Sequence, residues 1–330
     1  MKFSDIIICP SCKNSIIISN PIKCNSCSAK FSIENNIPLM YFENNWGDKK
    51  KDVTVDVKNF YEETPFPDYE NIDSISSLVN KSEKGFYAKF LNEQIPFSAR
   101  VIEVGCGTGQ LTNFLSIASR KVVGVDLCFN SLRLAENFRK NNNLENASFY
   151  QMNLFNPIFK EKSFDLVICQ GVLHHTSDPY LGYKSIEKLV KPGGYIIIGL
   201  YNFYGRLITD FRRMIFNITG NRFKQLDPRL KKIDRGSKKR NSWFNDQYKH
   251  PHESKHTISE VLKWFDKHDY TFINAIPKIK PFSPITYEEK LFRKNERGYF
   301  YHHILSQLGT IIPGYKEGGL FIMIGRKNVK

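Results

Sequence analysis

The stretch that most constrains the fold is Val101 to Leu115, VIEVGCGTGQLTNFL. Its apolar start predicts a buried strand, and the apolar residues at its end have the spacing of a helix. Between them stand Gly105, Gly107 and Gly109, which predict a sharp turn whose backbone approaches a ligand closely. A second apolar run ends about 20 residues further on at Asp126, where an acid binds ribose in nucleotide-binding α/β folds. The combination predicts a nucleotide-type cofactor at the ends of parallel strands.

Two classes of cofactor share this layout. The dinucleotide fingerprint G-x-G-x-x-G would place its third glycine at position 110, which is Gln110, whereas the third glycine comes one residue early. An acid, Glu103, also precedes the first glycine by two residues. This E-x-G-x-G-x-G form resembles motif I of the class I S-adenosylmethionine-dependent methyltransferases. The competing interpretation is a glycine-rich turn of an ordinary α/β domain.

Strands and helices alternate from Arg100 onward, which predicts a mostly parallel α/β sheet. Strands are expected to begin near Val101, Val122, Ala147, Phe164, Tyr195, Thr271 and Leu320. This order resembles the Rossmann-like class I methyltransferase fold, which implies that the last strand is antiparallel to the others. The resemblance covers residues 98–330. Insertions at 202–256 and 278–318 interrupt it, and long loops of this kind commonly bind substrate.

The first residues predict a separate small module. Four of the seven cysteines, Cys9, Cys12, Cys24 and Cys27, form two C-x-x-C pairs, a spacing typical of a zinc site. Residues 1–42 resemble the short zinc-ribbon modules at the front of some bacterial methyltransferases. A structural role for the metal is favoured, since so short a segment has little core of its own. Docking of a substrate or a partner protein is the alternative.

Residues 43–97 are expected to connect the ribbon to the sheet and to cover the cofactor pocket. Residues 43–57 are polar and predict a linker. The segment Phe60 to Tyr69, FYEETPFPDY, carries two prolines among aromatic residues, which predicts an extended stretch rather than a helix. It either covers the pocket or simply packs against the core. Gly85 to Glu93 has helical spacing.

The resemblance implies a set of cofactor-binding residues at the carboxyl ends of the strands. Asp126 is expected to accept both ribose hydroxyls. Asn153 stands where many family members have Asp, and its carbonyl oxygen is expected to accept from the adenine amino group. Leu154 would flank the adenine, and Gln170 would lie near the methionine end. The full predicted set is Glu103, Gly105, Cys106, Gly107, Gly109, Asp126, Leu127, Asn153, Leu154 and Gln170.

Two histidines follow the fourth strand in FDLVICQGVLHHTSDP, which resembles the family's fourth-strand motif. His174 and His175 are the candidates for catalysis, because a neutral imidazole can take a proton from an attacking hydroxyl or amine. The alternative is that one packs against the adenosyl group and the other caps a loop. Methyl transfer can also proceed by positioning alone.

Substrate contacts are expected from residues after the fifth strand and from a polar loop. The predicted substrate residues are Tyr201, Asn202, Tyr204, Arg206, Tyr248, His250 and His252, with Asp246 beside them. Arg206 suits binding of a substrate carboxylate or phosphate, and the alternative is that it forms an ion pair on the surface. The loop also contains H-E-x-x-H at 252–256, a zinc-protease pattern that requires a helix. The capping box T-I-S-E instead predicts that a helix begins at about residue 258, after the motif.

Composition leaves three functions open. The net charge of +15 favours nucleic acid, but 34 of the 48 basic residues are Lys, which indicates a general lysine bias with a solvated surface. No run is long enough to cross a membrane, and the start lacks a secretory signal, so a cytoplasmic location without a membrane partner is expected.

The favoured function is methylation of an O or N of a polar small metabolite. The alternatives are an RNA (tRNA or rRNA) methyltransferase and a non-catalytic cofactor-binding scaffold.

Overall fold

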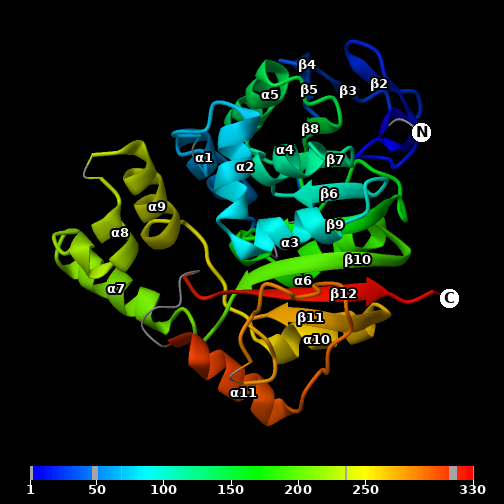
Figure 1. Ribbon diagram of the computed structural model, residues 1–330. Coiled ribbons are helices and arrows are strands. Elements are labelled where there is room, and N and C mark those ends of the chain that lie inside the picture. Colours follow the sequence, from blue (N-terminus) through cyan, green and yellow to red (C-terminus); the bar gives the residue numbers. More distant parts are fainter. Residues whose placement is uncertain are drawn as a thin grey trace.

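The computed structural model describes residues 3–46, 51–67, 69–234, 236–281, 283–311 and 318–329. A seven-stranded sheet in the order β11-β12-β10-β9-β6-β7-β8 forms its centre (Figure 1). Its strands are β6 Arg100–Val104, β7 Lys121–Asp126, β8 Ala147–Gln151, β9 Phe164–Gln170, β10 Val190–Tyr201, β11 Tyr270–Ile276 and β12 Leu320–Lys327. Strand β12 is antiparallel to both of its neighbours, and the remaining adjacent pairs are parallel. The predicted sheet and its antiparallel last strand are confirmed.

Helices cover both faces of the sheet. Because side chains alternate along a strand, Val101 of β6 packs in one apolar layer and Ile102 in the other, and both are fully buried. The first layer includes residues of α3 Phe86–Gln94 and α4 Gln110–Ser116. The second includes residues of α6 Pro179–Ile186 and α10 Ile258–Lys267. Helix α5 Phe129–Asn141 follows β7 and packs beside the edge strand β8.

The N-terminal module lies against the outer edge of the sheet. It consists of β1 Ile16–Ile17, β2 Ile22–Cys24 and β3 Lys30–Phe31, followed by the hairpin β4 Ile33–Glu34 and β5 Ile37–Pro38. The backbone N–H of Met40 donates to the carbonyl of Gln151 at 3.1 Å, and Ile8 donates to Ile158 at 2.8 Å. The module therefore covers the free edge of β8, which would otherwise expose unpaired backbone groups.

The segment between the module and the sheet corrects two expectations. Helix α1 Thr54–Glu63 occupies the end of the supposed linker and the start of the supposed extended stretch. The helix ends at Thr64 because Pro65 follows, and the residue before a proline is disfavoured in the helical conformation. The prolines therefore terminate a helix rather than exclude one. Helix α2 Ile75–Glu83 was not anticipated, whereas α3 lies where helical spacing predicted it.

The first insertion is largely helical, whereas the described part of the second is mostly irregular. Residues 202–256 form a lobe with α7 Leu207–Ile218, α8 Pro228–Lys232 and α9 Lys238–Tyr248, which stands beside the sheet (Figure 1). Residues 278–318 contain α11 Phe300–Leu308, and their part from 312 to 317 lies outside the described residues. Thr257 caps α10 by accepting from the backbone N–H of Glu260, as the capping box predicted. The H-E-x-x-H stretch therefore precedes the helix and cannot present a helical metal motif.

Candidate active site

The segment that contains Phe66 and Pro67 packs against the glycine turn that follows β6. Gly105, Gly107 and Gly109 all have positive φ, between 52° and 73°, which side-chain-bearing residues rarely adopt. A Cβ on Gly107 would lie 2.3 Å from the carbonyl oxygen of Phe66, so only glycine fits beneath this segment. Thr108 Oγ1 donates to the carbonyl of Pro67 at 2.6 Å and fastens the two segments together.

Asp126 organises the turn from the end of β7. Its Oδ2 accepts from the backbone N–H of Gly107 at 2.8 Å, and its Oδ1 accepts from that of Cys128, also at 2.8 Å. Burial raises the pKa of Asp126, and the two backbone N–H donors oppose that rise. A carboxylate oxygen can accept more than one hydrogen bond, so both oxygens of Asp126 can also accept a hydrogen bond from a ligand.

Glu103 lies in β6 below the same turn. Thr112 Oγ1 donates to its Oε2, and burial raises the pKa of Glu103 to about 7. A carboxyl with that pKa exists in both protonation states near neutral pH.

A cavity of about 540 Å³ opens at this edge of the sheet. Nine of the ten predicted cofactor residues line it, while Gly109 faces Ala135 and Phe149 instead. The nine lining residues are Glu103, Gly105, Cys106, Gly107, Asp126, Leu127, Asn153, Leu154 and Gln170. Asn153 is anchored by its Nδ2, which donates to the carbonyl of Phe42 at 2.9 Å, and its Oδ1 accepts from the backbone N–H of Phe155.

Five polar residues also line the cavity, and we call them the polar wall: Tyr61, His175, Tyr201, Asp246 and Gln247. Tyr61 Oη donates to Asp246 Oδ1 at 3.0 Å. Gln247 Nε2 donates to Asp246 Oδ2 at 2.8 Å and to Tyr201 Oη at 2.9 Å. The wall joins residues from α1, β10 and α9, so it exists only when the helical lobe packs on the sheet domain.

The two histidines occupy different environments. His175 lines the cavity, and its Nδ1–H donates to the carbonyl of His252 at 2.8 Å, which leaves the lone pair on Nε2. Burial lowers the pKa of His175, so its ring stays neutral. His174 does not line the cavity. Its Nδ1 accepts from the backbone N–H of Tyr201 at 3.3 Å, and its ring lies 3.9 Å from the Tyr201 ring, centroid to centroid.

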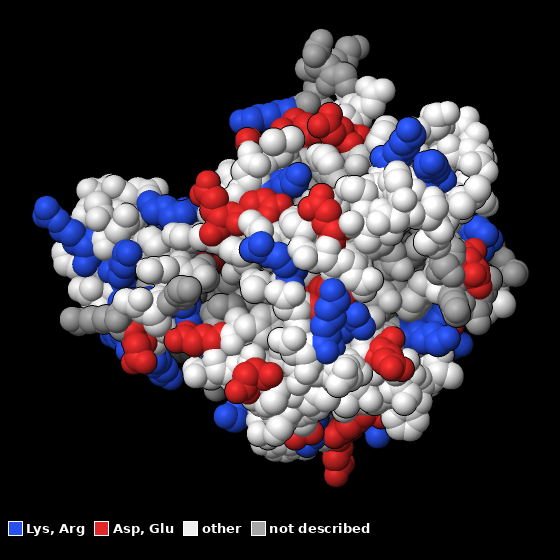
Figure 2. All heavy atoms as spheres, turned by 90° about the horizontal axis from the view of Figure 1, so that it is seen from above, with Lys and Arg blue, Asp and Glu red and all other residues white. Residues whose placement is uncertain are grey.

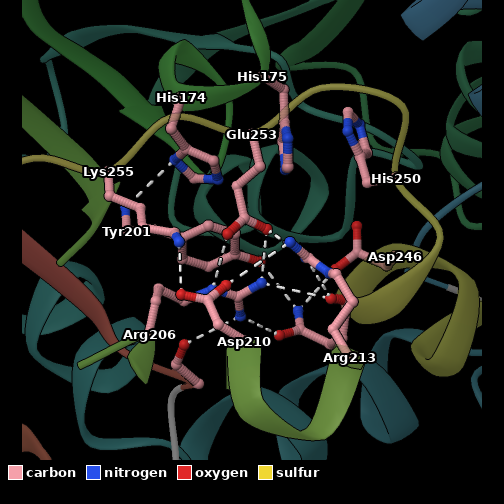
Figure 3. A network of polar contacts seen from close by, with 12 residues as sticks. His174, His175, Tyr201, Arg206, Asp210, Arg213, Asp246, His250, Glu253 and Lys255 are labelled. Carbon is pink, nitrogen blue, oxygen red and sulfur yellow. Dashed lines mark hydrogen bonds and ion pairs between the residues drawn. The ribbon is translucent and has the colours of Figure 1, made fainter. Parts of the chain in front are cut away.

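A buried ion-pair network stands behind the polar wall (Figure 3). Arg206 is fully buried, and its Nη2 lies 2.5 Å from Glu253 Oε2, while Arg213 Nη2 lies 2.8 Å from the same oxygen. Arg206 Nη1 donates to Gln247 Oε1 at 2.7 Å, which turns the Gln247 amide so that its NH₂ faces the wall. The guanidinium of Arg206 also stacks on the Tyr201 ring at 3.9 Å.

Most of the predicted substrate residues do not line the cavity, and that expectation is corrected. Among the seven, Tyr201 is the one that does. Arg206 is held by Glu253, Asn202 donates to Gln307 Oε1 at 2.8 Å, and Tyr248 Oη donates to Asp227 Oδ2 at 2.8 Å. The residues placed away from the cavity are Asn202, Tyr204, Arg206, Tyr248, His250 and His252. His250 instead stacks on His175 with ring centroids 3.5 Å apart, and His252 supplies the carbonyl that orients His175.

Several lining residues were not singled out as site residues, namely Tyr61, Phe66, Trp243 and Gln247. Tyr61 and Phe66 belong to the segment from Phe60 to Tyr69, which was expected either to cover the pocket or to pack against the core. Tyr61 and Asp246 are 185 residues apart, and neither neighbourhood resembles a known motif. Their pairing depends on the packing of α1 against the lobe, which no local pattern encodes.

The four N-terminal thiols lie together. Their Sγ atoms all fall within 4.8 Å of one another, with Cys12 and Cys24 at 3.4 Å and Cys9 and Cys27 at 3.6 Å. Sulfurs about 2.3 Å from a tetrahedral zinc are separated by roughly 3.8 Å, so the cluster has the dimensions of such a site.

Comparison with known proteins places the fold and cavity in a family. A family model described as a methyltransferase domain matches residues 98–267. The ubiquinone biosynthesis O-methyltransferase of Coxiella burnetii is 29% identical over 134 residues, which are 40% of this chain and 54% of that protein. An uncharacterized protein of Synechococcus is 27% identical over 198 residues, which are 53% of this chain and 48% of that protein. The chain thus spans about half the length of the curated relatives it matches.

A solved structure supports the same fold. PKMT2 of Rickettsia typhi in complex with AdoHcy has a TM-score of 0.52 and 13% identity, covering 73% of this chain and 52% of that one. The chain belongs to the class I S-adenosylmethionine-dependent methyltransferases. None of the helices in the described ranges is both long and apolar enough to cross a bilayer.

The ion-pair network makes a stability prediction. Replacing Arg206 by Met leaves the buried Glu253 with Arg213 as its remaining cation, and we expect a loss of about 3 kcal/mol in the free energy of unfolding. The double variant R206M/E253M should lose less than R206M alone, because no buried carboxylate is left short of a partner. Urea unfolding measures the free energy of unfolding of both variants.

Arg297→Met, which breaks the half-exposed pair with Asp266, is the control and should change stability by about 0–1 kcal/mol. Equal losses for R206M and the control would refute the importance of the buried pair.

Proposed function

We propose that this protein transfers a methyl group from S-adenosylmethionine to an oxygen or nitrogen of a small polar metabolite. The observation that carries the proposal is the single cavity in which the glycine turn and the polar wall face a common space. A donor and an acceptor held in one enclosed space react as an effectively intramolecular pair, which is the main source of acceleration for such a displacement.

We assign the cofactor to the sheet side of the cavity. Asp126 would accept from the ribose hydroxyls with the capacity that its two backbone donors leave free. Asn153 and Leu154 would flank the adenine, and Gln170 would lie by the methionine end. Gly109 acts indirectly, since its tight packing against Phe149 and Ala135 sets the start of α4.

We assign the acceptor to the polar wall. The cofactor supplies a methyl group on a sulfonium, which leaves as a neutral thioether. His175 is oriented with its Nε2 lone pair available, so it can take the proton that an attacking hydroxyl or amine releases. Tyr61, Tyr201 and Asp246 would fix the orientation of the acceptor. His174 is a positioning residue, which holds Tyr201 through the backbone.

The enclosed wall supports a small acceptor over RNA. Buried polar groups such as Asp246, which is 6% exposed, suit a compact molecule that fits within the cavity. The relative from Coxiella burnetii carries the name of an O-methyltransferase, which supports oxygen as the accepting atom. The RNA alternative, in which the ribbon and the basic surface bind phosphate, rests on net charge and domain layout. The scaffold alternative is disfavoured by the intact glycine turn and Asp126.

We also propose that Cys9, Cys12, Cys24 and Cys27 hold one structural zinc ion. The clustering of the four thiols supports this, and the buried apolar residues of the module belong to core clusters that they share with the sheet domain rather than to a core of its own. Its close packing along β8 supports a structural role rather than a free docking module.

The first test concerns the cofactor. Asp126→Asn keeps the shape of the side chain but removes the charge that strengthens hydrogen bonds from ribose hydroxyls, so the Kd for S-adenosylmethionine should rise about 100-fold. Isothermal calorimetry measures it. Asp165→Asn, which removes a half-exposed partner of Lys191, should bind like the parent. Unchanged affinity in Asp126→Asn would reject the cofactor assignment.

The second test concerns the base. His175→Gln should lower kcat by about 100-fold or more while cofactor affinity stays constant, once labelled methyl transfer from fractionated extract has identified the acceptor. Burial lowers the pKa of His175, so Nε2 stays unprotonated below the ordinary value of about 6.5. Activity should therefore fall on the acid side only below that pH. A variant with unchanged kcat would show that positioning alone is sufficient.

The third test concerns the metal. Metal analysis should find one zinc per chain, and Cys12→Ser with Cys24→Ser should lose it together with thermal stability of the N-terminal module. Cys169→Ala, which changes a buried cysteine of the sheet, should keep the zinc. A folded, metal-free module in the parent protein would contradict the proposal.

A further inference from the structure

Helix α7 presents an apolar stripe to solvent. Leu207, Phe211, Met214 and Ile218 follow one another at steps of four, three and four residues and so lie along one side of the helix. Their side chains are 45%, 59%, 51% and 77% exposed. Phe216, on another side, is 1% exposed and packs in the core of the lobe. The helix is therefore anchored by one apolar side, while a second apolar side remains exposed in the part of the chain that the structure describes.

Helix α11 repeats this arrangement. Tyr301, Leu305 and Leu308 follow at steps of four and three residues and are 56%, 47% and 41% exposed. The end of α11 meets the start of the lobe, where Asn202 Nδ2 donates to Gln307 Oε1. In Figure 1, α7 lies at the left and α11 at the bottom, and both lie outside the layers of the sheet. We call these seven residues the apolar ridge: Leu207, Phe211, Met214, Ile218, Tyr301, Leu305 and Leu308.

Positive charge is concentrated in the same lobe. Residues 202–256 contain 14 Lys and Arg against 5 Asp and Glu, a formal net charge of +9 out of +15 for the whole chain. Figure 2 views the molecule from above and shows Lys and Arg side chains at the outer end of the lobe, at the left, with Asp and Glu side chains among them. Just beyond α7, Phe223 and Leu226 are 46% and 44% exposed, and the exposed Arg222 stands beside them. Exposed cations also follow on and after the next two helices, at Lys231, Lys232, Lys239 and Lys249.

We infer that the apolar ridge and the basic lobe dock this enzyme on an anionic lipid surface. An exposed apolar helix face with cations around it is the arrangement by which a helix lies in the plane of a bilayer interface. The apolar side chains enter the boundary between head groups and acyl chains, while Lys and Arg attract anionic head groups. Such docking needs no spanning helix, so it agrees with the short helices of the described residues.

Two other partners fit the ridge less well. A second copy of the chain packed on the ridge would bring two lobes of +9 each against one another, and such like charges repel. RNA would engage the cations, but a phosphate backbone gives no reason to expose Leu207, Met214 and Ile218 along one line. A lipid surface satisfies both the apolar and the charged component.

Flotation or sedimentation with vesicles tests the inference on the full-length, zinc-loaded protein. Vesicles of phosphatidylcholine with phosphatidylglycerol should bind it, vesicles of phosphatidylcholine alone should bind it weakly, and salt should reduce the binding. The double variant Phe211→Ser with Met214→Ser should bind at least about ten-fold more weakly. The variant Lys231→Gln with Lys232→Gln should weaken binding to the anionic vesicles and leave binding to the neutral ones unchanged.

A matched control removes exposed apolar residues elsewhere. Ile17→Ser with Ile18→Ser changes side chains that are 52% and 47% exposed in the N-terminal module, at the opposite end of the molecule in Figure 1, and should bind vesicles like the parent. The affinity for S-adenosylmethionine should be unchanged in all variants, since these residues do not line the cavity. The melting temperature should also be unchanged, since the substituted side chains are exposed. Failure of the parent to bind anionic vesicles, or equal binding by the ridge variant, would overturn the inference. A dimer in light scattering that the ridge variant abolishes would assign the ridge to a second copy instead, and RNA binding that depends on the ridge would assign it to RNA.

Discussion

The buried ion pair between Arg206 and Glu253 is the contact on which the acceptor side of the cavity depends. Glu253 neutralises a guanidinium that has no access to water, and that guanidinium in turn fixes Gln247 and stacks on Tyr201. Gln247 then holds Asp246 and Tyr201 in one wall. Because a buried charge without its partner is strongly unfavourable, the pair holds the two ends of the lobe together. The contacts of Arg206 and Gln247 with Tyr201 then join the lobe to β10. The positions of the polar-wall residues therefore depend on how the lobe packs on the sheet, and not on those residues alone.

The two sides of the cavity are built by different means. The proposed cofactor side uses strand ends, a glycine turn and an acid after the next strand, as nucleotide-binding α/β sheets do. The proposed acceptor side comes from α1, from the end of β10 and from an inserted helical lobe. The same lobe carries the apolar ridge on α7, so one insertion contributes both to the proposed acceptor site and to the proposed lipid-binding surface. Substrate choice and location would thus be set by the same segment, while the chemistry of methyl transfer stays with the sheet.

The sequence allowed the sheet, the glycine turn and the capped start of α10 to be predicted, because each depends on residues close together in the chain. Helix α1 was not predicted because Pro65 and Pro67 favour an extended conformation. Prolines that follow the last residues of a helix are nevertheless compatible with that helix. Arg206 and Tyr248 were predicted to contact substrate, whereas in the structure they bond to other side chains and do not line the cavity. Their partners, Glu253 and Asp227, are 47 and 21 residues away, and no local pattern shows that these polar groups satisfy one another. Tyr61 was missed for the same reason.

In the proposed function, one cavity joins a methyl-donor side to an acceptor side. The most direct test is a crystal structure with bound S-adenosylhomocysteine, the product left after methyl transfer. We expect the ribose at Asp126, the adenine beside Asn153 and Leu154, and the sulfur facing His175 and Tyr201. Binding of the product with its sulfur turned away from the polar wall, or at a site outside this cavity, would contradict the proposed function.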